Sequence, residues 1–401
     1  MGFLTTAGIF ILVLFVLVLV HELGHYITAR IFGIRTLEFG FGYPPKIRGF
    51  RLFSSEEIQA WEQRTGPRPG FWRRLGYRIV GDTELTVNWL PLGGFVRLLG
   101  EEDPSDPRSL AAKRPLVRLI VLSAGAFMNF ILPIALFTLA YMIPQRAAVG
   151  GALVTSVQAG SPAAAAGVHP GDQIIRINGR GIQNAGDAGY NIRLNQGRWM
   201  TWTVVRRETF GSGIVASQTL ELRVYARWAP PYFVDPSTSK RVREGPTGIS
   251  VADRTNATRV ESKPFWEAIP LGFRSTFDTL TLAKNQVISL IAQRTAPEVQ
   301  GPVGIAQATG EVVRQAGWVA LLQFAALLSL NLAIFNILPI PMLDGGRILF
   351  VLIEIARRGK RVAPEREALV HFIGFVILIS AVVVISYFDI ARIIRGDNVF
   401  R

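Results

Sequence analysis

The stretch LVLVHELGHYITA, Leu17 to Ala29, places two histidines and a glutamate at the end of a dense apolar run. The run begins near Phe3, so the whole segment exceeds the ~20 residues that a helix needs to cross a bilayer. It has no lysine or arginine before Arg30 and shows no clear cleavage site. We therefore predict a retained membrane span rather than a signal peptide.

The composition of the 401-residue chain also favours a membrane protein. Hydrophobic residues make up 49% of it, and the mean hydropathy is +0.31. The chain has no cysteine, which excludes disulfides, thiolate zinc sites and a cysteine nucleophile. The net charge of +14 fits attraction to lipid headgroups, and no nucleic-acid-binding motif accompanies it, so we expect no nucleic-acid partner.

Apolar segments of sufficient length are predicted to cross the membrane at Phe3–Ala29, Leu116–Ile143, Trp318–Pro339 and Leu369–Tyr387. The loops at 31–114 and after residue 346 carry many basic residues close to these spans. The positive-inside rule therefore places both loops in the cytoplasm. Both termini and the long stretch at 144–317 are then expected outside it.

The outer stretch contains a small predicted domain at 148–226. GALVTSV and GDQIIRING are typical of strands, and SPAAAAGV between them is typical of a short helix capped by Ser161. The pattern resembles a PDZ domain, which binds peptides as an added strand. A small β-rich domain without a ligand is the alternative. We expect 227–317 to be a linker with an amphipathic helix at Pro264–Arg294, either on the outer membrane surface or packed against the spans.

His21 and His25 are spaced i, i+4, so a helix presents both rings on one face. Two such nitrogens suit a tetrahedral zinc ion, and Glu22 beside them is placed to take a proton from a water molecule. The alternative is a pair of interfacial histidines that point to lipid headgroups. Ionisable residues at membrane depth are costly, which favours the functional interpretation.

A catalytic zinc ion needs a third protein ligand, and Asp344 in NLAIFNILPIPMLDGGRILF is the best candidate. It follows the third predicted span at the same cytoplasmic depth as the histidine pair. Pro339 and Pro341 break the helix there, and two glycines follow the aspartate. The alternative is an acid that ends a helix in a turn. The remaining histidines, His169 and His371, lie in the outer domain and at the start of the fourth span.

HELGH in the first span, with NxxPxPxLDGG in a later one, resembles the site-2 protease family of intramembrane zinc metalloproteases. GFGYPPKI resembles the membrane-re-entrant loop of that family, PLGGFVRLLGE its edge strand, AGAFMNF its second-span motif and GPVGIAQATG the segment before its third span. The resemblance leaves out residues 51–82, which show no assignable pattern. Together these features predict a polytopic α-helical membrane protein with about four transmembrane helices, membrane-associated β-loops and one extracytoplasmic α+β PDZ-like domain.

The resemblance implies His21, His25 and Asp344 as Zn²⁺ ligands and Glu22 as general base. It implies a substrate-binding set of Asn336, Gly40, Gly42, Gly93, Gly94 and Pro341, in which Asn336 holds the scissile carbonyl and the glycines line the path of an extended substrate. An interhelical hydrogen bond is the alternative role of Asn336. The implied setting is a bacterial plasma membrane, and the implied partners are single-span membrane proteins such as anti-sigma factors and remnant signal peptides, besides a peptide ligand of the PDZ-like domain.

Two other functions remain open from the residues alone. A non-catalytic membrane adaptor would use only the PDZ-like domain and would bind no metal. A transporter would use the intramembrane acids, but the chain has few spans and no repeated half.

Overall fold

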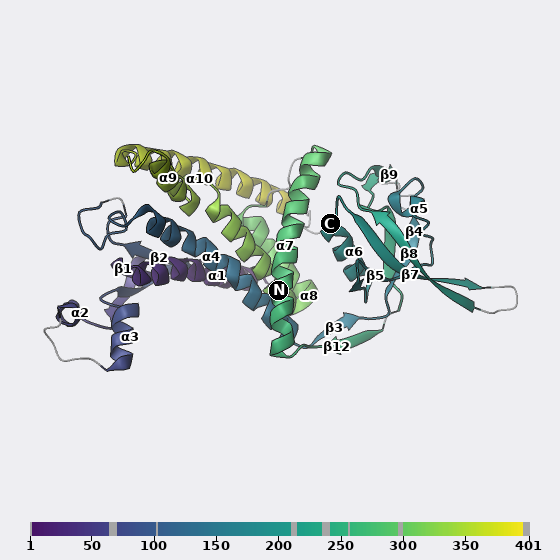
Figure 1. The fold of residues 1–401 in the computed structure, drawn as a ribbon, viewed down its shortest axis with the longest axis horizontal. Helices are drawn as coiled ribbons and strands as arrows, with labels where there is room; N and C mark the ends of the chain where they lie inside the picture. The colour runs from purple at the N-terminus through teal and green to yellow at the C-terminus, as the bar shows by residue number, and fades with distance from the viewer. Residues whose placement is uncertain are drawn as a thin grey trace. The chain divides into compact units, whose positions relative to one another are not determined.

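The computed structural model describes residues 2–63, 70–101, 103–209, 215–234, 241–255, 257–295 and 300–395. Its internal contacts divide the chain into two compact units. Unit 1 comprises residues 1–140 and 299–401, and unit 2 comprises residues 141–298 (Figure 1). Each unit is treated by itself below.

Among the described residues, four helices are long and apolar enough to cross a membrane. They are α1 (Phe3–Ile31), α4 (Pro115–Met142), α8 (Pro302–Ile337) and α10 (Pro364–Ile394). The prediction of four spans is confirmed at this level. With its sheet-rich regions, the chain has the build of a polytopic membrane protein.

The region around the third span differs from the prediction. The helix α8 begins at Pro302 rather than Trp318, and Gly317 interrupts it with φ +79° and ψ −172°. Glycine adopts this backbone without strain because it has no Cβ. A further helix, α9 (Asp344–Ala356), begins at the aspartate and occupies part of the predicted basic loop. The arginines near the ends of α9 are compatible both with a loop and with a short helix. The charge pattern alone therefore could not predict which of the two forms.

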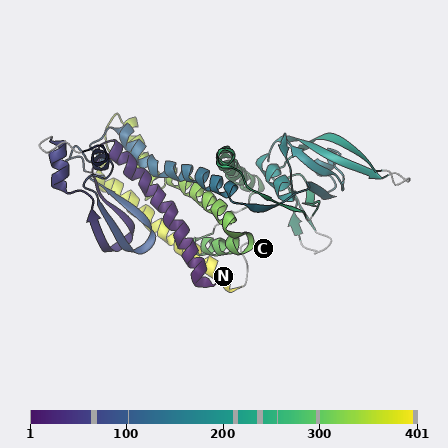
Figure 2. The same ribbon diagram turned by 90° about the horizontal axis from the view of Figure 1, so that it is seen from below.

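The first loop region folds as a two-stranded antiparallel sheet of β1 (Thr36–Arg51) and β2 (Glu84–Leu98). The strand β2 packs against α1, and both views show the sheet beside one end of that helix (Figures 1 and 2). Between the strands lie α2 (Ser55–Glu62) and α3 (Phe71–Ile79). These two helices occupy the segment in which the sequence shows no pattern.

Unit 2 is built on a six-stranded sheet with the order β11-β4-β5-β7-β8 and with β6 paired to β5. Its core packs around the fully buried Trp202, Ile174 and Ile177. Ser161 caps a short helix by accepting a hydrogen bond from the Ala164 amide at 3.2 Å, as predicted. The elements are β3 (Gln145–Ala148), β4 (Ala152–Val157), α5 (Pro162–Ala165), β5 (Gln173–Ile177), β6 (Arg180–Gly181), α6 (Ala185–Leu194), β7 (Trp199–Thr209), β8 (Val215–Tyr225), β9 (Tyr232–Val234), β10 (Arg241–Arg243), β11 (Ile249–Asp253), β12 (Thr258–Glu261) and α7 (Phe265–Gln293).

The stretch predicted as a linker is largely structured. Within it, β11 pairs with β4 and completes the sheet, so the predicted end of the domain at residue 226 is too early. The helix α7 packs through its polar side, where Asn285 donates hydrogen bonds to the Arg193 and Leu194 carbonyls at the end of α6. Phe273 and Phe277 on its other side are about half exposed. The helix thus packs on unit 2, a partner that the sequence did not indicate.

Candidate metal centre

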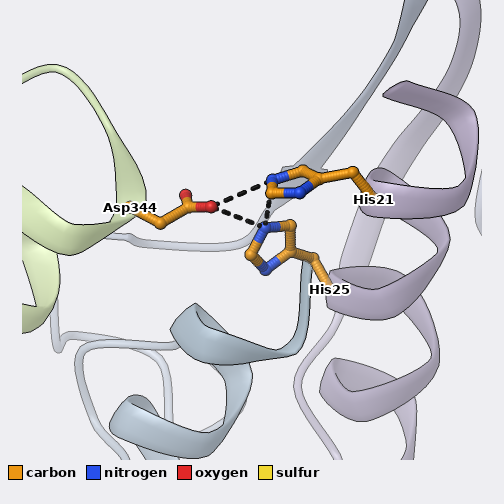
Figure 3. A group of neighbouring side chains, drawn as sticks. All are labelled: His21, His25 and Asp344. Carbon is orange, nitrogen blue, oxygen red and sulfur yellow. Dashed lines mark hydrogen bonds and ion pairs between the residues drawn. The ribbon is translucent and has the colours of Figure 1, made fainter. Parts of the chain in front are cut away.

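The rings of His21 and His25 and the carboxylate of Asp344 meet at one point inside unit 1 (Figure 3). Asp344 Oδ2 lies 2.9 Å from His21 Nε2 and 3.2 Å from His25 Nε2. The two Nε2 atoms are 3.2 Å apart, and both histidines are buried. The three residues predicted as ligands therefore converge, although the aspartate comes from a helix more than 300 residues along the chain.

The helical period and a glycine pair produce this convergence. One turn of α1 stacks the two rings on the same side, as their spacing predicts. Asp344 sits in the first turn of α9, directly after the non-helical stretch that ends α8. A Cβ on Gly345 would collide with the Leu338 carbonyl, and one on Gly346 would lie 2.7 Å from the Ile340 oxygen. The glycines thus let α9 start against the end of α8, which brings the carboxylate to the rings.

The surroundings fit a zinc ion held by this donor set. Two imidazole nitrogens and one carboxylate oxygen are typical zinc ligands, and three protein ligands leave a position open for catalysis. Across from the rings, a Cβ on Gly125 of α4 would collide with His25 Nε2 and lie 2.6 Å from His21 Nε2. The backbone of α4 therefore keeps clear the space beside both ligand nitrogens.

The far nitrogens of both rings have partners of their own. His25 Nδ1 lies 2.8 Å from the Val121 carbonyl of α4. His21 Nδ1 lies 3.2 Å from the amide of Asn129, which is fully buried, and 3.4 Å from that of Asn336. Such contacts orient ligating rings and fix their tautomers. The sequence pointed to Asn336 but not to Asn129, whose only signal was its place in the motif AGAFMNF.

Glu22 lies next to the ligands and is held by β2. Its Oε2 atom accepts a hydrogen bond from the Val96 amide at 3.0 Å. The contact joins the C-terminal half of α1 to a strand that is 74 residues away in the chain. The sequence predicted Glu22 as a base, but it gave no sign of this tether.

The four glycines predicted to line a substrate path lie in and around the β1–β2 sheet. Gly40 pairs with Phe95, and a Cβ on Gly94 would lie 2.7 Å from the Gly40 oxygen. Gly93 has φ +130° and faces Val18 of α1, while Gly42 has φ +82°. Their small size therefore serves close packing of β1, β2 and α1.

The other singled-out residues lie outside the ligand group. Pro341 packs against Gly374 of α10. His371 accepts a hydrogen bond from the Met342 amide at 2.8 Å and so braces the same loop. His169 belongs to unit 2. Neither histidine belongs to the group of potential metal ligands found among the described residues.

Comparison with known proteins shows which family contains this chain. Residues 9–59 and 70–381 match Peptidase family M50. Two relatives, each named "Putative zinc metalloprotease", come from Clostridium perfringens (33% identical, covering 93% of this chain and 95% of the relative) and Agrobacterium fabrum (30% identical, covering 98% of each). Zinc metalloprotease RasP of Oceanobacillus iheyensis is 29% identical over 97% of this chain and 100% of its own. The resemblance read from the motifs is thus confirmed: the chain belongs to Peptidase family M50, the site-2 protease family of intramembrane zinc metalloproteases.

Proposed function

We propose that the protein cleaves single-span membrane proteins within the bilayer, in regulated intramembrane proteolysis. The observation that carries this proposal is the convergence of His21, His25 and Asp344 on helices that are long and apolar enough to span a membrane. Anti-sigma factors and remnant signal peptides are the substrate classes that the motif resemblance favours.

In this proposal His21, His25 and Asp344 hold the zinc ion, and Glu22 moves the proton. When bound, zinc supplies Lewis-acid chemistry that polarises a peptide carbonyl and acidifies water. The carboxylate of Glu22 takes up a proton from the attacking water and passes it to the departing amine. The Val96 amide fixes one of its oxygens, which leaves the other for the proton.

Asn336 is proposed to hold the scissile carbonyl, in line with its motif. Its amide lies beside the ligand ring of His21, which supports a place at the reaction centre. Gly40, Gly42, Gly93, Gly94 and Pro341 are proposed to border the substrate path. Gly40 pairs with Phe95 on one side and with Thr86 on the other, so it lies inside the sheet. The stretch at 94–98 pairs with β1 alone, and an extended segment pairs readily with such an edge. A helical substrate would have to unwind to present its peptide bond in this way.

The setting proposed is a bacterial plasma membrane, with the metal centre near the cytoplasmic face and both termini outside the cytoplasm. The basic residues beside the spans support this orientation.

Unit 2 would then be extracytoplasmic, and we propose that it is PDZ-like. A cavity of about 360 Å³ supports a peptide site there, since its lining includes Ile249 and Val251 of the edge strand β11 and Ile192 of α6.

A single pair of variants tests the function. Glu22→Gln should retain about one zinc ion per chain and lose cleavage of a co-expressed single-span substrate. Asp344→Asn should lose both zinc and cleavage. Unchanged cleavage by Glu22→Gln would refute the catalytic assignment. A zinc-free purified wild-type chain without activity would favour the non-catalytic adaptor instead.

A further inference from the structure

The short helix α3 exposes an apolar face that nothing in the proposed proteolysis uses. Phe71 is 64% exposed, Trp72 is 79% exposed and Ile79 is 46% exposed. At 100° per residue, positions 71, 72 and 79 fall on one side of a helix. Large aromatic and aliphatic side chains gathered in this way mark an interaction surface.

The opposite side of α3 is fastened to the rest of unit 1. Tyr77 is 5% exposed and packs edge-on against Phe53, with 4.7 Å between ring centroids. The Tyr26 hydroxyl donates a hydrogen bond to the Ile79 carbonyl at 3.0 Å. Arg30 donates another to the Tyr77 carbonyl at 2.9 Å. The exposed face is thus held in a fixed direction relative to the end of α1.

The length of α1 supports a position of these fastening points near the lipid headgroups. The span Leu4–Ile31 has 28 residues and is about 42 Å long as a helix. The hydrocarbon core of a bilayer is about 30 Å thick, so the last turns of α1 extend beyond it. Tyr26 and Arg30 belong to these last turns, and α3 is attached there (Figure 1).

The charge around α3 matches an anionic surface. The sequence from 64 to 80 contains five arginines and no acidic residue. Three of these arginines belong to α3 itself. The neighbouring α2 carries three acids and no basic residue, and its Glu57 pairs with Arg73. The pair of helices is therefore polarised, with an apolar and basic side on α3 and an acidic side on α2.

We propose that α3 is an interfacial anchor that lies in the headgroup layer and binds anionic phospholipids. Trp72 and Phe71 enter the boundary between headgroups and acyl chains, where amphipathic aromatic rings are favoured. The net positive charge of the segment at 64–80 attracts the lipid phosphates. The surface is separate from the metal centre, so this assignment stands whether or not the chain is a protease.

The absence of cysteine allows a direct test on the full-length chain. Trp72→Cys and Ile79→Cys each create a unique site for a spin label, and Gln59→Cys on the exposed side of α2 is the matched control. Each labelled protein is placed in nanodiscs of phosphatidylcholine, with and without phosphatidylglycerol. The collision rates of the label with oxygen and with a water-soluble nickel chelate report its depth. Zinc content checks that each variant is folded.

In discs with phosphatidylglycerol, labels at 72 and 79 should collide several-fold less with nickel than the label at 59, and more with oxygen. Removing the anionic lipid, or adding Arg74→Gln with Arg78→Gln, should raise nickel access at 72 and leave 59 unchanged.

Nickel access at 72 equal to that at 59 would overturn the proposal. Shielding of the labels at 72 and 79 from both oxygen and the nickel chelate would also overturn the proposal, because it indicates that a protein surface covers them. Depth independent of the anionic lipid and of both arginines would overturn the phospholipid assignment.

Discussion

The carboxylate of Glu22 accepts a hydrogen bond from the backbone amide of Val96, with 3.0 Å between Oε2 and the nitrogen. The proposed base on α1 is thereby tied to β2, the strand proposed to border the substrate. Base and strand edge therefore keep a fixed relation to each other.

Val96→Pro removes the amide hydrogen of this tether. The amide points to Glu22, so the change does not take this hydrogen bond from the β1–β2 ladder. A hydrogen bond to a charged group contributes about 1.5–3 kcal/mol, so we expect cleavage to fall roughly 10- to 100-fold. Zinc content should be unchanged. Val96→Ala keeps the amide and should cleave at close to the wild-type rate; a Val96→Pro variant that did the same would exclude a role for the tether.

Substitution of Asn129 should weaken zinc binding, whereas substitution of Asn336 should slow cleavage. Asn129 is fully buried at 3.2 Å from His21 Nδ1, so Asn129→Leu should weaken zinc binding by about 10- to 100-fold. Asn336→Leu should reduce cleavage with little change in zinc affinity. Competition against a chelator of known affinity measures the first effect, and substrate turnover at saturating zinc measures the second. The reverse pattern would exchange the two roles.

Gly125→Ala should empty the metal centre. The added methyl group would collide with His25 Nε2 and press on the His21 ring, where the zinc ligands must converge. Metal analysis of the purified variant should show most of the zinc lost. Gly8→Ala is the control, because nothing lies within 4 Å of the added carbon there. Full zinc content in Gly125→Ala would show that α4 does not border the ion.

An ion-pair network holds α9, the helix that begins with Asp344. Arg118 Nη1 lies 2.6 Å from Glu354 Oε2, and both side chains are nearly buried. Arg361 reaches the other oxygen of Glu354 at 3.2 Å. In Arg118→Met, the buried carboxylate of Glu354 loses the partner at 2.6 Å. Removing one member of a buried ion pair lowers the free energy of unfolding by about 3–5 kcal/mol. We expect a clear drop in the temperature of half-inactivation, most of it recovered in Arg118→Met with Glu354→Met. A drop that the double variant does not recover would assign the loss to packing instead.

The histidine pair was predictable because its spacing is local, whereas Asp344, 323 residues away, was singled out by its motif and its expected depth. Helical spacing pairs His21 with His25, and the proline and glycine residues around Asp344 mark a break at matching depth. The positions missed depend on distant partners. Asn129 meets His21 across 108 residues, and β11 joins a strand almost a hundred residues earlier. The helix α3 was missed because it is short and interrupts a region of no clear period.

The buried carboxylate of Asp389 is the single buried residue of α10, all of whose residues are described. It accepts hydrogen bonds from the Gly301 and Gly304 amides at 2.9 and 2.8 Å, at the start of α8. The first amides of a helix have no partner within it. During synthesis these donors therefore stay uncapped until α10 emerges and inserts. The cap on α8 is thus supplied by a helix made later in synthesis, and a nascent protein that has not yet reached Asp389 lacks the cap on the helix that leads to Asn336.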